Sequence, residues 1–450
     1  QQSGLDSVDL LYLHRFDDET ELEETFSTLA EMQQTGQIRY IGVSNYAAWQ
    51  VMKAQAVCQR LGTRIAAVQP MYSLVKRQAE VELFPMAQDQ HIAIVPYSPL
   101  GGGLLTGKYA MNHRATRNGT PLRHDTPNLA TCLRKVGYAP KLFGYTDTTH
   151  DPNVMEADDP RLQSYEELMP GFDEVVRMRM ESDVTAWTDH LAANGIDTPG
   201  YPDIYKPGGD HIRSPAIYPA ELSDTAFLTD RFLDFLAEAE EGWCATLTYI
   251  RPHPPFVAPE PYNQMYDAAE MPPAKSEKLS HPFLDTARDA SHPAMTVVGH
   301  MGLPDNDETV ADLRALYLGL ASEVDHHIGR VVQQLKDAGT YDDTLIVVTS
   351  DHGEMLGERG AWFKFQPFEW SVRVPMIASG PGARAGHVEE KGVSLLDLLP
   401  TFNDLATEGN APNPIEPIVG KSLANMLHGD NSGRADDVMI EFLGEGVYAP

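Results

Sequence analysis

The chain has no hydrophobic run that approaches the roughly 20 residues a membrane-spanning helix needs, which argues against a membrane protein. Cysteine is also scarce: Cys58, Cys132 and Cys244 are far apart and odd in number. This excludes a disulfide framework and a cysteine-rich metal knuckle. We interpret the three as buried, reduced thiols and place the protein in the cytoplasm.

Basic residues are few, 34 Lys and Arg against 65 Asp and Glu, which gives a formal net charge of -31. Such a surface repels phosphate backbones and argues against a nucleic-acid partner. Alternatively, the net charge reflects only an acidic, well-solvated surface. An initial Met is missing as well and a strand pattern begins almost at once, so we expect the chain to be truncated, and a missing signal peptide says nothing about export.

The length and the hydrophobic content of the chain are enough for several hydrophobic cores. A length of 450 residues with 42% hydrophobic residues predicts two or three domains. The pattern of predicted strands and helices changes near Met111. We therefore predict an α/β protein with domains over 1–110 and 111–450.

The first hundred residues read as strands alternating with helices. Strands are predicted over 7–14, 38–45, 66–72 and 91–100, and helices over 22–34 and 49–61. Strand runs that are apolar throughout indicate a parallel sheet covered by helices.

Polar side chains fall at or near the carboxyl ends of these strands, where a (β/α) barrel places its active site. They are His14, Ser44, Asn45, Gln69, Tyr97 and Ser98. Any one of them could instead be a strand-end group satisfied by a loop.

The segments D-L-L-Y-L-H-R, I-R-Y-I-G-V-S-N, Q-P-M-Y-S and V-P-Y-S-P-L-G-G-G-L-L-T-G-K-Y resemble the aldo-keto reductase family over about positions 3–109. The resemblance implies a partial (β/α) TIM barrel that uses NADP. His14 would polarise the substrate carbonyl, and the nicotinamide and pyrophosphate would contact Ser44, Asn45, Gln69, Tyr97, Ser98 and Leu100. Four strands are half of such a barrel, and the family's proton donor lies on strands that this chain lacks, so we expect no reductase activity from this half alone.

Downstream, helices are predicted over about 126–138, 228–236 and 313–335, and strands over 141–146, 243–250 and 344–349. The strand over 344–349, T-L-I-V-V-T, is the most apolar in the chain, is predicted to be buried and runs into S-D-H-G-E. Sites in open parallel sheets lie at the carboxyl ends of strands, so Asp351 and His352 could form half of a divalent-metal site. The alternative is an Asp helix cap beside a solvated His, with Glu354 as a helix-start acid.

Two further residues could act on an anion. Lys364, in W-F-K-F-Q-P-F-E, could neutralise a sulfate or phosphate oxygen, and His253, in R-P-H-P-P-F, could serve as general acid. The alternatives are a surface Lys with a buried stem and a structural His.

The segments L-L-T-G-K-Y-A-M-N-H-R, G-Y-T-D-T, Y-I-R-P-H-P-P-F, E-V-D-H-H-I-G and V-V-T-S-D-H-G-E resemble the sulfatase branch of the alkaline-phosphatase-like superfamily, nearest to phosphonate monoester hydrolases, from about Leu104 onward. This implies an α/β sandwich that hydrolyses small-molecule esters with a divalent metal, Ca²⁺ or Mn²⁺. The resemblance gives Asp351 and His352 as metal ligands, Lys364 and His253 at the reacting group, and Asn118 and Tyr145 as substrate contacts. Asp147 stands where family members often have a hydroxyl residue.

The nucleophile of that family is absent from this chain. The family makes it from the Cys of a C-x-P-x-R motif just before L-L-T-G, where this chain has Tyr97 at the Cys position and Gly101 at the Arg position. Both families have the hexapeptide L-L-T-G-K-Y at this position. A junction inside a shared hexapeptide favours recombination or a sequence-assembly join. Three interpretations stay open: a crippled sulfatase-like hydrolase, a reductase fragment, and a chimera without catalysis. The oligomeric state is also open, a homo-oligomer included.

Overall fold

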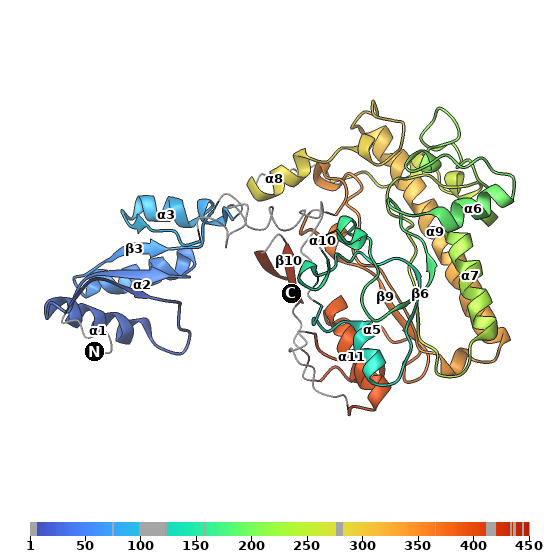
Figure 1. Ribbon diagram of the computed structural model, residues 1–450. Coiled ribbons are helices and arrows are strands. Elements are labelled where there is room, and N and C mark those ends of the chain that lie inside the picture. Colours follow the sequence, from blue (N-terminus) through green and yellow to red (C-terminus); the bar gives the residue numbers. More distant parts are fainter. Residues whose placement is uncertain are drawn as a thin grey trace. The chain divides into compact units, whose positions relative to one another are not determined.

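The computed structural model describes residues 7–73, 76–98, 122, 124–156, 158–275, 282–364, 366–410, 420–432, 434, 438–442 and 445–449. The chain divides into two compact units, residues 1–115 and 116–450 (Figure 1). Each unit is described by itself.

Unit 1 is a four-stranded parallel sheet in the order β1-β2-β3-β4. Its strands are β1 (Val8–Leu13), β2 (Ile38–Ser44), β3 (Ile65–Gln69) and β4 (Ala93–Ile94). Its described helices are α1 (Leu22–Gln34), α2 (Ala48–Arg60) and α3 (Leu83–Asp89). The predicted helix over 22–34 is therefore confirmed residue for residue, and the parallel sheet is confirmed with it.

One hydrophobic core holds unit 1 together. Alternate side chains of the strands, Ile41 and Val43 among them, pack against Phe26 of α1 and Val51 of α2, and all four are fully buried. On the other face of the sheet, Tyr12 lies over Gly42, where an added Cβ would meet its ring at 2.5 Å. A helix layer thus covers one face of the sheet, as in half of a barrel.

Unit 2 contains three separate sheets among its described residues. The parallel sheet β6-β5-β7 consists of β5 (Lys141–Gly144), β6 (Asp173–Arg177) and β7 (Ala245–Leu247). The strands β8 (Ile346–Thr349) and β9 (Met376–Ser379) pair antiparallel with each other, and β10 (Val438–Phe442) pairs antiparallel with β11 (Glu445–Ala449). The prediction that the T-L-I-V-V-T strand is buried was wrong, because β8 has one described strand neighbour and its apolar residues remain partly exposed.

Helices α7 (Asp224–Glu238) and α9 (Asp307–Asp337) run side by side along unit 2 (Figure 1). The core beside them is aromatic: Phe143 of β5 meets Phe232 of α7 edge to face at 5.1 Å. The remaining helices of the described part are α5 (Leu129–Lys135), α6 (Thr185–Ala193), α8 (Pro282–Asp289), α10 (Glu369–Val372), α11 (Leu398–Thr407) and α12 (Ala424–Leu427).

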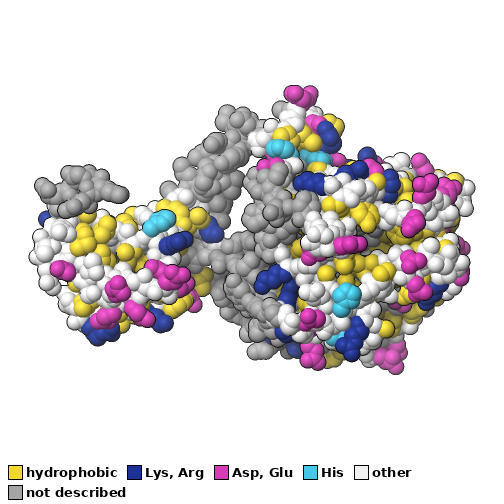
Figure 2. Space-filling view, turned by 90° about the horizontal axis from the view of Figure 1, so that it is seen from below, with side chains coloured by type: hydrophobic (Ala, Val, Ile, Leu, Met, Phe, Trp, Pro, Cys, Tyr) yellow, Lys and Arg dark blue, Asp and Glu magenta, His cyan; other side chains and the backbone are white. Residues whose placement is uncertain are grey.

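On the face of the molecule that Figure 2 shows, the acidic side chains do not gather in a single patch. They are scattered among Lys and Arg and hydrophobic side chains. Among the described helices, none has the length and apolar character to cross a membrane.

Candidate functional site

Three chain segments of unit 2 carry polar residues beyond the carboxyl ends of strands. Tyr145 and Asp147 follow β5, His253 lies six residues after β7, and Asp351 with His352 follows β8. The charges of Asp351 and Lys364 act on His253, and those of Asp147 and Asp351 act on Tyr145, so these segments converge. The structure therefore brings together the predicted hydrolase-site residues that it describes.

The centre of this site is a contact between Lys364 and His352. The Lys364 Nζ lies 2.7 Å from His352 Nε2, and the ring of His253 stands edge-on to that of His352 with 5.8 Å between centroids. His352 Nδ1 lies 2.8 Å from the Gly353 carbonyl oxygen, and His253 Nδ1 lies 2.5 Å from that of Pro254. Because a carbonyl only accepts, each Nδ1 carries the proton, and His352 Nε2 accepts from the Lys364 ammonium.

The electrostatics keep both imidazoles neutral at neutral pH. Burial, followed by the Lys364 charge, lowers the pKa of His253 to about 4, and burial also lowers the pKa of His352. Desolvation by the surrounding protein raises the pKa of Asp147 to about 6, with Lys364 opposing it, although the side chain keeps an exposed surface. Before a ligand binds, the His253 ring is thus neutral, and its Nε2 can accept a proton.

The loop that carries His253 is fixed by Arg251. Its guanidinium donates to the Pro255 carbonyl oxygen at 2.7 Å and forms an ion pair with Asp224 at 3.2 Å, both side chains being almost fully buried. A buried charge needs such partners, and here they hold both ends of the five-residue loop.

Glu354 fixes the loop that carries Lys364. The prediction of a helix-start acid was wrong, because the chain does not enter an α-helix after the S-D-H-G-E segment. Instead the buried carboxylate of Glu354 accepts a hydrogen bond from the Phe363 N–H at 2.6 Å. Phe363 has a φ of 64°, a conformation that a bulky residue rarely adopts, so this bond secures the backbone next to Lys364.

Two residues near this site were not found from the sequence: Glu166 and Glu181. The carboxylate of Glu166 is buried and accepts from the backbone N–H groups of Glu181 at 3.1 Å and Ser182 at 2.9 Å. The charges of Glu166 and Glu181 act on Asp147 and Tyr145. Their segment, 146–222, shows weak periodicity, so no local signal placed it beside the strand ends.

The described residues do not fit a metal ion. They contain no group of three or more His, Cys, Asp or Glu side chains that could hold one. Asp351 and His352 supply two donors, and the nitrogen that His352 would offer a metal faces the Lys364 ammonium. A hard divalent cation takes six or more ligands, so two donors with a cation beside them hold it poorly.

In unit 1 the predicted rim residues come together at the carboxyl ends of the strands. The Tyr97 hydroxyl donates to Asn45 Oδ1 at 2.7 Å, and Asn45 Nδ2 donates to the His14 carbonyl oxygen at 2.9 Å. The Ser44 hydroxyl donates to the Gln69 carbonyl oxygen at 2.9 Å. These polar groups form hydrogen bonds with one another, which agrees with the alternative that each is a strand-end group satisfied locally. The His14 side chain is exposed.

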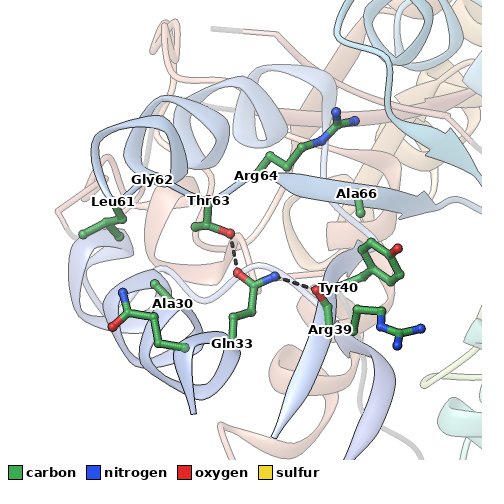
Figure 3. Close-up of a pocket in the computed structure, with 10 residues that line it drawn as sticks. Ala30, Gln33, Arg39, Tyr40, Leu61, Gly62, Thr63, Arg64 and Ala66 are labelled. Atoms are coloured by element: carbon green, nitrogen blue, oxygen red, sulfur yellow. Dashed lines mark hydrogen bonds between the residues drawn. The ribbon is translucent and has the colours of Figure 1, made fainter. Parts of the chain in front are cut away.

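One hollow in the described part of unit 1 lies away from this rim. It measures about 630 Å³ and is lined from the carboxyl ends of α1 and α2 and the amino-terminal ends of β2 and β3, with Gln33 joined to Thr63 and to the Arg39 carbonyl oxygen (Figure 3). The catalytic ends of barrel strands are the carboxyl ends, so we give this hollow no role in the site. Of the remaining predicted residues, Ser98 has a φ of 52° at the end of the rim, and Leu100 and Asn118 lie outside the described residues.

Comparison with known proteins matches both halves. The family model described as sulfatase matches residues 98–408, and that of the aldo/keto reductase family matches residues 1–146, so the two overlap over 98–146. A solved phosphonate monoester hydrolase from Silicibacter pomeroyi is 48% identical with a TM-score of 0.69, over 77% of this chain and 70% of that one. The fold resemblance predicted for the larger half is thereby confirmed.

Two curated relatives mark the two halves. The multifunctional alkaline phosphatase superfamily protein PehA of Trinickia caryophylli is 37% identical over 68% of this chain. The aldo-keto reductase family 7 member A3 of Homo sapiens is 43% identical over 23% of this chain. The chain spans 63% of the first relative's length and 31% of the second's.

Proposed function

Because its match covers residues 98–408, the chain belongs to the sulfatase family, and we propose that its larger unit binds sulfate, phosphate or phosphonate esters. The observation that supports this is the grouping of Lys364, His352 and His253 beyond two strand ends. A half-buried ammonium beside two neutral imidazoles is a suitable anion contact, since low solvation strengthens its attraction for an oxyanion.

Each residue has a distinct part in this proposal. Lys364 would exchange its contact with His352 for an ester oxygen, and His253 Nε2 would face the leaving group. An anion bound there favours the protonated imidazole, so binding would raise the pKa of His253 from about 4 and prepare it as an acid. Tyr145 would bound the pocket beside them, and Asn118 is proposed on sequence grounds alone.

Members of this family generally use a divalent metal, and we place its remnant at Asp351 and His352, with Ca²⁺ or Mn²⁺ as the ion. The two available donors predict weak binding, and we assign no reaction step to the metal. We also propose that the chain turns over esters hardly at all, because Tyr97 replaces the Cys of the nucleophile motif and covalent catalysis loses most of its rate without the nucleophile.

The test is binding of phenyl sulfate by calorimetry to the full chain. Replacing Lys364 by Met keeps the side-chain length and removes the charge, so we expect at least about tenfold weaker binding. The matched control is Lys336→Met, since this exposed Lys lies at the far end of α9 and contacts the Tyr341 ring. Equal binding by the wild type and Lys364→Met would show that the pocket is wrongly placed.

Turnover of nitrophenyl sulfate is measured with the same purified protein. His352→Ala is the control for contaminating enzymes. We expect negligible turnover in both. Robust turnover that disappears in His352→Ala would reveal a nucleophile other than residue 97 and contradict the proposal.

The second candidate function is that of the reductase-like unit. Aldo/keto reductases use NADP, and we propose that Ser44, Asn45, Gln69, Tyr97, Ser98 and Leu100 would contact its nicotinamide and pyrophosphate, with His14 beside the substrate. Half a barrel offers half of the contacts, so we expect no saturation with NADPH by fluorescence titration up to millimolar concentrations. Micromolar affinity would favour this function.

A small-molecule ester is the partner that this proposal names. We keep the expectations of a cytoplasmic protein without nucleic-acid or membrane partners, from its thiols, its charge and its lack of long apolar runs. A homo-oligomer stays open.

A further inference from the structure

The Lys364 ammonium occupies the ring nitrogen of His352 that a metal ion would use. His352 Nδ1 donates to the Gly353 carbonyl oxygen at 2.8 Å, so the free lone pair of the ring lies on Nε2. Lys364 Nζ lies 2.7 Å from this Nε2 and donates to it. A metal ion binds a neutral imidazole through the same lone pair. The ammonium and a metal ion therefore cannot hold this nitrogen at the same time.

Asp351 brings a second donor to the same place. Its Oδ2 lies 3.4 Å from His352 Nε2, and its side chain is largely exposed to solvent. Ions such as Zn²⁺ bind imidazole nitrogen and carboxylate oxygen at about 2.0–2.2 Å, so two donor atoms with this separation can share one ion. The two side chains are thus arranged for a cation, and the cation that His352 contacts is the Lys364 ammonium.

Ser371 fixes the backbone on both sides of this contact. Its hydroxyl donates to the Lys364 carbonyl oxygen, and its own carbonyl oxygen accepts from the Gly353 N–H at 2.7 Å. Ser371 is buried, and a Cβ added to Gly353 would come within 2.1 Å of the Trp370 carbonyl oxygen. The Lys364 side chain has a flexible stem, so its ammonium can leave Nε2 while both backbone segments stay in place.

We propose that Lys364 is an internal competitor for a divalent ion at His352 Nε2. Its ammonium blocks this nitrogen while no anion is bound, and an oxyanion that draws the ammonium away opens the nitrogen to the ion. The exclusion follows from the contact between Lys364 and His352. The release rests on the proposed function, in which Lys364 exchanges His352 for an ester oxygen. Because coupling between two ligands is reciprocal, the ion and the oxyanion should then favour each other's binding.

The exclusion is tested by calorimetric titration of Co²⁺ into the full chain. Lys364→Met removes the ammonium, and we expect it to bind Co²⁺ about tenfold more tightly or better than the wild type, since no hydrogen bond from a charged donor has to be broken. Ca²⁺ prefers oxygen ligands, so its gain should be smaller. Lys336→Met is the matched control and should change neither affinity. Circular dichroism verifies that each variant is folded.

A double-mutant cycle with His352→Ala separates the freed nitrogen from the loss of a positive charge, which by itself favours a cation. Co²⁺ bound elsewhere on the acidic surface is common to all members of the cycle. When His352 is already Ala, most of the gain from Lys364→Met should vanish. An equal gain in both backgrounds, or no gain in Lys364→Met alone, would show that Lys364 does not compete for Nε2.

The release is tested by repeating the Co²⁺ titration with phenyl sulfate at a concentration that saturates each protein. We expect about tenfold tighter Co²⁺ binding in the wild type and a much smaller change in Lys364→Met, in which no ammonium blocks the nitrogen. If phenyl sulfate binds and leaves the Co²⁺ affinity of the wild type unchanged, the release is wrong while the anion pocket stands. If phenyl sulfate does not bind, the proposed function and the release are both wrong, and the Lys364→Met titration still decides the exclusion.

Discussion

The buried charges of unit 2 show how single residues are tuned. Glu323 of α9 is almost fully buried near Asp224 and Arg251, the pair that fixes the His253 loop. Burial, followed by the charge of Asp224, raises the pKa of Glu323 from 4.5 to about 7, with Ser223 and Arg251 opposing it. The folded protein therefore holds a proton that the unfolded chain releases at a lower pH.

This predicts a stability that depends on pH. The contribution from Glu323 protonation is fully present below about pH 4.5 and is lost as the pH rises through about 7. Glu323→Gln stays neutral, so we expect its free energy of unfolding to exceed that of the wild type at pH 8 by on the order of 2 kcal/mol and to match it near pH 4.5. Urea unfolding at the two pH values measures this.

The control for that experiment is Asp325→Asn, an exposed position on the same helix. It should change the free energy of unfolding little at either pH. A Glu323→Gln variant that is equally destabilised at both pH values would mean that the carboxylate is needed in its charged form.

At the scale of elements, α9 shows how packing overrides helix propensity. Its Gly319 lies against the backbone of the turn Tyr262–Gln264, where an added Cβ would come within 2.0 Å of the Tyr262 carbonyl oxygen. Gly329, ten residues along the same helix, has nothing within 4 Å of an added Cβ. The sequence alone does not distinguish the surroundings of these two glycines.

Substituting Ala at each position therefore has opposite expected effects. Gly329→Ala should stabilise the protein by about 0.5–1 kcal/mol, because Ala is the better helix former. Gly319→Ala should lower the free energy of unfolding by roughly 2 kcal/mol or more, since rigid backbone has to move. Thermal unfolding of both variants gives the comparison, and stabilisation by Gly319→Ala would contradict the packing described for α9.

At the scale of the whole molecule, the two units have separate cores. One hydrophobic cluster belongs to unit 1 and the two others to unit 2. The four-stranded sheet of unit 1 has two outer strands, β1 and β4, each with one strand neighbour among the described residues. Because of these unpaired edges and the half-covered sheet, we predict that unit 1 is the less stable unit.

Limited proteolysis should therefore cut residues 7–98 before the 307–364 region. Fragments identified by mass spectrometry after increasing times of trypsin digestion give the order of cleavage. Equal protection of both regions would mean that unit 1 is as stable as unit 2, and that its open edges are covered in solution.

The sequence by itself determined the elements whose pattern is local. The apolar spacing from Leu22 onward predicted α1, because helix formation depends on contacts three and four residues apart. Residues next to strand ends, such as Asp351, His352 and His14, could be found because the apolar strand runs that precede them are local patterns. Family motifs, not periodicity, supplied the roles for His253 and Lys364.

Tertiary structure alone decided how those residues meet. Three contacts join segments that are far apart or lack periodicity: the antiparallel pairing of β8 and β9, the hydrogen bond from the Phe363 N–H to the Glu354 carboxylate, and the one from the Glu181 N–H to the Glu166 carboxylate. The same holds for the Lys364 ammonium on His352 Nε2, which turns an expected metal ligand into an acceptor. Local sequence cannot encode such contacts, because they depend on which surfaces the packed elements bring together.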